Sequence, residues 1–113
     1  MNSKVLSSSI LGIDAYIVEV ECHITASRVP KFVTVGLPEG AVKESKERVS
    51  AAIQNSGYKL PGKHITVNLA PADIRKEGSA FDLPIAIGLL SAIGEVSEDY
   101  INKILLMGEL ALD

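Results

Sequence analysis

Hydrophobic and polar residues alternate through most of the first 37 positions, and this pattern predicts strands before any helix. Residues 4–11 alternate, Gly12-Ile13-Asp14 supplies a turn, and residues 15–24 alternate again. One face of the second stretch collects its apolar side chains, which are Tyr16, Val18, Val20, Cys22 and Ile24. Because alternation with a period of two is typical of half-buried strands, the two stretches are predicted to form a β-hairpin. Residues 31–37 predict a third strand.

The pattern changes to a helical period after Pro38, a residue type that is well tolerated in a first helical turn. Between Pro38 and Asn55, one face carries the inward-facing residues Val42, Ser45, Val49, Ala52 and Ile53. The other face carries opposite charges four residues apart, a spacing that stabilises an exposed helical surface. Gly57 is expected just beyond the end of this helix. Residues 64–69 predict the next strand, whose inward residues are Ile65, Val67 and Leu69.

A second helix is predicted over residues 82–93, a nearly all-apolar stretch that ends at Gly94. Asp82 is the preferred N-cap because it leaves Pro84 in the first turn of the helix. Ser79 is the alternative cap, since it lies three residues before an acidic residue in a capping-box arrangement.

The last part of the chain predicts a short helical turn from Ser97 through Asn102 and a final strand at residues 104–113. The predicted order is therefore β-β-β-α-β-α-β. This order favours an α/β (α+β) fold, a mixed sheet of four to five strands with two main helices on one face. With 113 residues, 47% of them apolar, residues 1–113 are expected to form a single domain. Because the last predicted strand ends with neither turn nor cap, we expect this domain to be a fragment of a longer protein.

Composition and charge narrow the classes of function. The net charge of −3 gives no global basic surface for nucleic acid. The longest apolar run, residues 83–93, is too short to span a bilayer, so no membrane partner is expected. A lone cysteine, Cys22, cannot form an internal disulfide and suits a reducing cytoplasm. Cys22 and His23 point to opposite faces of their strand and His64 lies far along the chain, so no metal site is expected.

The loop at residues 73–79 concentrates polar side chains at the mouth of the apolar helix. Ser79 is the candidate nucleophile, with Lys76 as its general base in the Ser-Lys variant of covalent catalysis. An effective lysine base must be partly desolvated, and Lys76 is expected in an exposed loop. A general acid–base pair among Asp73, Glu77 and Asp82 has little support, because no histidine accompanies them. A contact role is therefore favoured over catalysis.

Two surfaces are the candidate contact sites. The loop contributes Asp73, Arg75, Lys76 and Glu77, and the exposed face of the first helix contributes Lys43, Glu44 and Glu47. A nucleic-acid-binding surface is the alternative, built from Arg75 and Lys76 together with Arg28 and Lys31. Its support is weak because the two loop charges lack the flanking aromatic residues that stack on bases.

Four long segments resemble one known family in the right order. They are SSSILGIDAYIVEVE, VGLPEGAVKESKERVSAAIQNSGY, ITVNLAPADIRKEGSAFDLPIAIGLL and GELALD. Over essentially its whole length, the chain resembles the N-terminal domain of the magnesium-chelatase-like AAA+ proteins of the YifB/ComM competence family. The resemblance implies a fold like the proteolytic domain of Lon protease.

The same resemblance offers a test of the serine hypothesis. Lon proteases open the corresponding helix with a Lys-Asp-Gly-Pro-Ser-Ala-Gly type segment. Laid onto residues 76–82, Gly78 matches the glycine, Ser79 falls at the proline, and the nucleophile position falls on Ala80. A methyl group cannot attack a carbonyl, so the resemblance implies a relic site. A shift of one residue would place Ser79 there, so Ser79 stays the alternative nucleophile.

The resemblance also implies what partners this domain has. An ATPase module with ATP and Mg²⁺ sites is expected to follow it in the parent protein, and the subunits are expected to form a hexameric ring. No cofactor site is expected within this chain, since Gly62-Lys63 precedes a strand whereas a P-loop lysine opens a helix. We therefore expect a non-catalytic domain that supports ring assembly or substrate positioning, in a parent that processes DNA during natural transformation.

Overall fold

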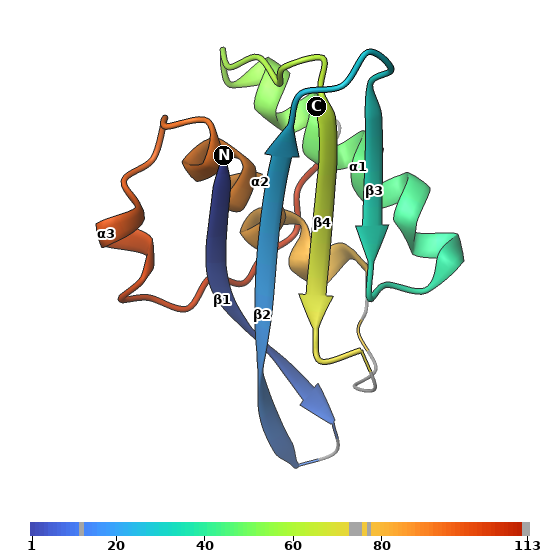
Figure 1. Ribbon diagram of the computed structural model, residues 1–113. Coiled ribbons are helices and arrows are strands. Elements are labelled where there is room, and N and C mark those ends of the chain that lie inside the picture. Colours follow the sequence, from blue (N-terminus) through green and yellow to red (C-terminus); the bar gives the residue numbers. More distant parts are fainter. Residues whose placement is uncertain (12, 73–75, 77, 112–113) are drawn as a thin grey trace.

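The computed structural model describes residues 1–11, 13–72, 76 and 78–111. Its elements, seen in Figure 1, are β1 (Asn2–Leu11), β2 (Asp14–Thr25), β3 (Lys31–Val35), α1 (Glu39–Asn55), β4 (His64–Ala70), the 3₁₀ helix η1 (Gly78–Phe81), α2 (Asp82–Ala92) and α3 (Glu98–Ile101). The strands form one sheet in the order β1-β2-β4-β3. β1 and β4 both pair antiparallel with β2, and β3 pairs parallel with β4. The predicted hairpin, the mixed sheet and the α/β (α+β) class are confirmed.

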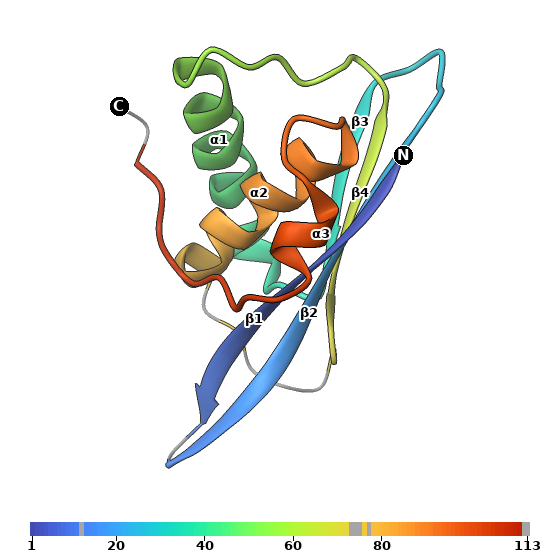
Figure 2. The same ribbon diagram turned by 90° about the vertical axis from the view of Figure 1, so that its left-hand side faces the viewer.

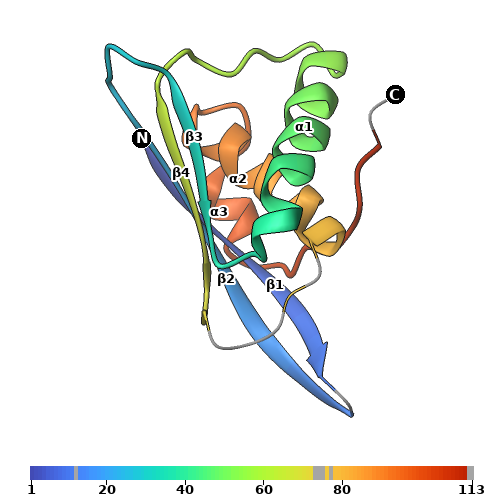
Figure 3. The ribbon, with the colours of Figure 1, turned by 90° about the vertical axis from the view of Figure 1, so that its right-hand side faces the viewer.

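The helices of the described chain lie together on one face of the sheet, as Figures 2 and 3 show from opposite sides. The strand side chains that point toward them form the core, and the faces predicted to point inward are confirmed. Fully buried members from β2 and β4 are Val18, Val20, Cys22, Val67 and Leu69. α1 contributes Val49 and Ile53, and α2 contributes Ile85 and Leu89. This layer of aliphatic side chains holds α2 against β1 and β2.

Gly88 lets α2 approach the first two strands closely. A Cβ at this position would lie 2.7 Å from Cys22 Sγ, closer than real contacts allow. The Ser3 hydroxyl donates to the carbonyl of Gly88, so the helix is fastened to β1 at the point of closest approach. The small residue therefore fixes how deeply α2 lies on the sheet.

Both main helices end as the glycine pattern predicts. Gly57 follows α1 with φ +90°, and Gly94 follows α2 with φ +87°, a conformation that glycine adopts without the steric cost of a Cβ. Behind Gly57, the Tyr58 N–H donates to the carbonyl of Ile53 at 3.1 Å. The predicted C-terminal ends of both helices are confirmed.

The predicted caps at the start of α2 are wrong. Asp82 is the first residue of the helix rather than its N-cap, and Phe81 occupies the cap position without a side-chain hydrogen bond. Ser79 lies within η1, one turn earlier. The Leu83 N–H is satisfied instead by the backbone carbonyl of Gly108, 3.1 Å away. A distant segment of the chain, which local sequence rules do not see, therefore caps this helix.

The predicted last strand is also wrong within the described residues. Its only ladder contact there is an isolated parallel bridge between Leu6 and Leu105, supported by a 2.9 Å hydrogen bond from the Leu106 N–H to the carbonyl of Leu6. The segment then leaves the edge of β1 and passes beside the start of α2, where its backbone groups find other partners. Ser97 does precede the short helix α3, but without a side-chain cap bond.

Candidate functional site at the start of helix α2

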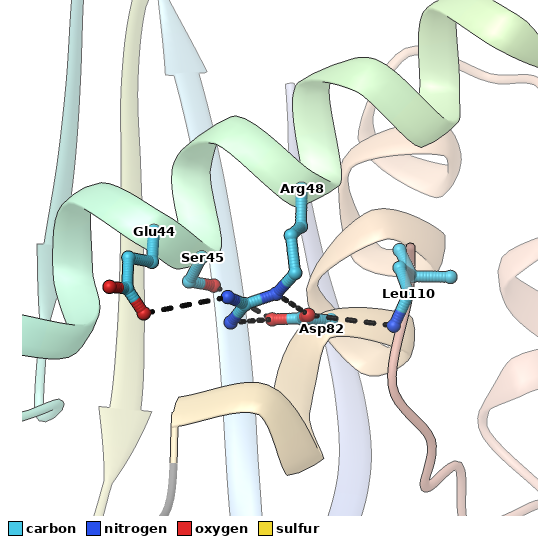
Figure 4. A network of polar contacts seen from close by, with 5 residues as sticks. All are labelled: Glu44, Ser45, Arg48, Asp82 and Leu110. Carbon is cyan, nitrogen blue, oxygen red and sulfur yellow. Dashed lines mark hydrogen bonds and ion pairs between the residues drawn. The ribbon is translucent and has the colours of Figure 1, made fainter. Parts of the chain in front are cut away.

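A fully buried aspartate forms the centre of the site (Figure 4). The Arg48 Nε donates to Asp82 Oδ2 at 2.5 Å, and its Nη2 donates to Oδ1 at 3.3 Å. Asp82 is 0% exposed and Arg48 only 20%. Burying a carboxylate is costly unless it is paired and hydrogen-bonded, and the two-pronged guanidinium meets that need. The pair joins α1 to α2.

Three further groups complete the network. The Ser45 hydroxyl, one turn before Arg48 on the inward face of α1, donates to Asp82 Oδ1 at 3.1 Å. The Leu110 N–H points at Asp82 Oδ2 from 3.5 Å. On the solvent side, Glu44 lies 3.8 Å from Arg48 Nη1 and is 73% exposed. One carboxylate thus links two helices and the segment that follows α3.

The charge state of the network follows from these contacts. The hydrogen bond to Asp82 raises the pKa of Arg48 above its ordinary value, with Coulomb attraction to Asp82 and Glu44 acting in the same direction. Partial burial opposes the shift. Arg48 therefore stays protonated over the whole physiological range and acts as a fixed positive charge rather than as a proton donor.

Sequence reasoning missed Arg48. Its spacing from Glu44 fits an ordinary exposed pair, and Asp82 had an obvious local use as a helix cap. The one available signal was Ser45, a polar residue on the inward face of α1 that needs a partner if it is buried. It is 2% exposed, and its partner is Asp82.

Ala80 lies beside this network and is half-buried. Its side chain packs against the core, and its carbonyl accepts a hydrogen bond from the Gly108 N–H at 3.3 Å. Gly108 also approaches Leu83 so closely that a Cβ would lie 3.2 Å from its Cδ2. Residue 80, where the resemblance to the Lon-type segment would place a nucleophile, therefore carries a packed methyl group whose backbone is bonded to Gly108.

The exposure expected of Lys76 is wrong. The side chain is only 3% exposed, and its ammonium donates to the carbonyl of Pro71. A long aliphatic stem can be buried where its charged end finds a carbonyl. The sequence prediction assumed that the whole loop was solvated and did not consider this. Ser79 is half-buried. The other predicted loop residues, Asp73, Arg75 and Glu77, lie outside the described residues.

The predicted face of α1 is placed as expected. The side chains of Lys43, Glu44 and Glu47 are all exposed. They lie on α1, the helix that also carries Arg48 of the buried pair. Their contact with a partner stays a prediction.

The described residues give no support to metal chemistry. Among them, no group of three or more His, Cys, Asp or Glu side chains is placed to hold a metal ion. Burial raises the pKa of Cys22 to about 12, and a metal ligand needs the thiolate. In the described part of the chain, no helix has the length and apolar character needed to cross a membrane.

Comparison with known proteins identifies the family. A family model described as "Subunit ChlI of Mg-chelatase" matches residues 20–113. The chain belongs to the ChlI family. The matched part includes Arg48, Asp82 and the segment around Gly108, so the whole buried network lies within the ChlI-family region.

Individual relatives agree with the ChlI assignment. The chain is 49% identical to the protein YifB of Escherichia coli (strain K12) over 110 residues, which is 97% of this chain and 22% of YifB. It is 46% identical to the competence protein ComM of Haemophilus influenzae over 108 residues, 96% of this chain and 21% of ComM. A protein of Mycobacterium tuberculosis (strain H37Rv) is 40% identical over 97% of this chain and 22% of its own length. The chain thus spans about a fifth of the length of these curated relatives.

Proposed function

We propose that this chain is a non-catalytic, Lon-protease-like accessory domain of a magnesium-chelatase-like AAA+ ATPase. The observation that carries the proposal is Ala80, a half-buried methyl group with its backbone bonded to Gly108, at the position where the resemblance to Lon proteases places the nucleophile. The Arg48–Asp82 pair beside it serves to hold α1, α2 and the later segment in one arrangement. A site built this way positions elements and does not cut a peptide bond.

The longer relatives support a role within a larger assembly. ATP and Mg²⁺ then belong to a module outside residues 1–113, and the partners are that module and the other subunits of a hexameric ring. The relative named as a competence protein supports DNA processing as the setting. The exposed charges on α1 are the surface that contacts the ATPase module.

The test uses the longer protein that carries this chain. Lys43→Glu with Glu47→Lys reverses two charges on the exposed face of α1 without touching the core. We expect ATP turnover or ring formation to fall by at least about threefold, a loss of about 0.7 kcal/mol and typical of exposed charge contacts. Lys103→Glu, an exposed charge beyond α3, is the matched control. Unchanged turnover and ring formation would contradict the contact role of this face.

A Ser-Lys peptidase is the second candidate, because Lys76 is buried rather than solvated. Lys76 was disfavoured as a general base because it was expected to be solvated, and its burial removes that objection. Hydrolysis of a fluorogenic peptide library by the wild type, abolished in both Ser79→Ala and Lys76→Met, would replace the accessory role with this one.

A nucleic-acid surface is the third candidate, since Lys31 lines a hollow of about 200 Å³ together with Phe32, Lys46 and Lys63. Clustered lysines attract phosphates, and such binding weakens as salt rises. Fluorescence anisotropy with a labelled single strand would show salt-dependent binding that Lys31→Glu with Lys63→Glu reduces and Lys103→Glu does not. No binding at low salt removes this candidate.

A further inference from the structure

The β1–β2 hairpin projects well beyond the helices (Figures 1, 2 and 3). Exposed isoleucine side chains lie at and near its tip. Ile13 is 101% exposed, Ile10 75% and Ile17 54%. Ile10 pairs with Ala15 in the ladder, so Ile10 and Ile17 are diagonal neighbours on one face. Single exposed aliphatic side chains are ordinary, but three on one projecting tip mark a contact surface.

A groove lies at the opposite end of the molecule, beyond the C-terminal end of α1. It has a volume of about 500 Å³ and is lined by Ser50, Ile53, Gln54, Gly57, Tyr58 and Leu60, with Lys59 beside them. Gly57 leaves open space where a side chain would stand, and Tyr58 is 40% exposed. In Figure 1 the hairpin tip lies at the bottom and this end of α1 at the top. One chain therefore carries an apolar projection and an apolar recess at its two ends.

The charges at the two ends are opposite in sign. The tip carries the exposed Asp14, and no Lys or Arg occurs at residues 5–27. The groove end carries Lys59 and Lys63, and no Asp or Glu occurs at residues 49–72. A tip brought to the groove of another copy would place Asp14 near lysine ammonium groups, whereas two tips or two grooves would repel each other.

We propose that the hairpin tip of one copy inserts into the α1-end groove of a second copy. Ile13 enters the recess over Ile53 and Tyr58, and Asp14 faces Lys59. Such a head-to-tail contact uses different surfaces on each copy, and it generates a ring when the rotation between copies closes. The inference deepens the assembly role proposed above and rests on it.

Cross-linking tests the geometry directly. Chains carrying Ile13→Cys are mixed with chains carrying Gln54→Cys, an exposed residue of the groove, and treated with a short bismaleimide. The natural Cys22 is fully buried, so it does not react in the native chain. We expect the mixed pair to cross-link in preference to either variant alone. Cross-linking of Ile13→Cys mainly with itself would show a two-fold tip-to-tip contact and overturn the proposal, as would no cross-link.

Sedimentation equilibrium tests whether Ile13, Asp14 and Lys59 contribute to self-association. It is run up to about 1 mM protein, a concentration at which weak contacts become measurable. Ile13→Asp should weaken self-association about tenfold or more, because a buried Ile side chain contributes on that scale. Tyr100→Asp, on an exposed side chain of α3 (68%), should leave it unchanged. Asp14→Lys should weaken association, and adding Lys59→Asp should restore it. The proposal is overturned if Ile13→Asp and Tyr100→Asp weaken self-association equally, or if Lys59→Asp does not restore the association lost in Asp14→Lys. If the chain stays monomeric and also lacks peptidase activity, the tip-to-groove contact is disproved but the proposed non-catalytic role is not.

Discussion

Replacing Arg48 by Met should destabilise the chain more than its partly exposed position suggests. The substitution keeps the aliphatic stem. Among the described residues, it leaves the Asp82 carboxylate, which is 0% exposed, with the Ser45 hydroxyl and the more distant Leu110 N–H as its partners. Breaking a buried ion pair by removing one partner typically costs about 3–5 kcal/mol. Because Arg48 is 20% exposed, water can reach part of the vacated space, and we expect about 3 kcal/mol.

A second substitution tests whether the loss of stability comes from the unpaired charge on Asp82. In the Arg48→Met background, Asp82→Asn replaces an unpaired buried charge by a neutral amide of the same shape, so it should recover about 1 kcal/mol or more. In the wild-type background the same Asp82→Asn change should be destabilising. Glu44→Gln is the matched control, since its 3.8 Å contact is at the surface and should be worth less than about 0.5 kcal/mol.

Urea unfolding followed by circular dichroism measures all four variants. For a domain of this size, a loss of 3 kcal/mol lowers the midpoint by about 1–3 M urea at an ordinary slope. The reasoning is refuted if Arg48→Met costs less than about 1 kcal/mol, or if Asp82→Asn makes the Arg48→Met variant less stable still.

Three further predictions concern the core. Gly88→Ala places a Cβ 2.7 Å from Cys22 Sγ and should cost about 1–3 kcal/mol in urea unfolding, with Cys22→Ala relieving part of it. The Cys22 pKa, raised to about 12 by burial, should make stability fall above pH 9 by up to about 1.4 kcal/mol per pH unit, and Cys22→Ala should remove that fall. The hydroxyl of Ser7 has no hydrogen-bond partner among the described residues, so Ser7→Ala should leave the thermal midpoint unchanged or raise it.

The sheet and the helix ends were predictable because each depends on local signals. Alternation fixes which face of a strand is apolar, and the buried faces of β2 and β4 match it residue by residue. Gly57 and Gly94 mark helix ends because no other residue reaches a positive φ so cheaply. A sequence pattern suffices where the controlling interactions lie within a few residues.

The centre of the site was not predictable by the same means. Arg48 and Asp82 are 34 residues apart and meet only because α1 and α2 pack side by side. The Leu83 N–H at the start of α2 is satisfied by the Gly108 carbonyl, and this use of the later segment draws the described residues after Leu106 away from β1. Lys76 is a different case, because its ammonium donates to the carbonyl of Pro71 only five residues earlier, and the prediction did not consider that a buried lysine can be satisfied in this way. The misses at Arg48, Asp82 and the start of α2 all involve polar groups whose partners are set by tertiary packing.

The central proposal is that this domain is non-catalytic, and labelling with a fluorophosphonate serine probe tests it most directly. The native chain, Ser79→Ala and a heat-unfolded control would be treated together and compared by intact-mass spectrometry. If residue 80 is the position that the Lon-type segment assigns to the nucleophile, its methyl side chain cannot react, and we predict the same background level of labelling for the wild type and for Ser79→Ala. Stoichiometric labelling of the native wild type that disappears in Ser79→Ala would contradict the claim and make this domain an active hydrolase.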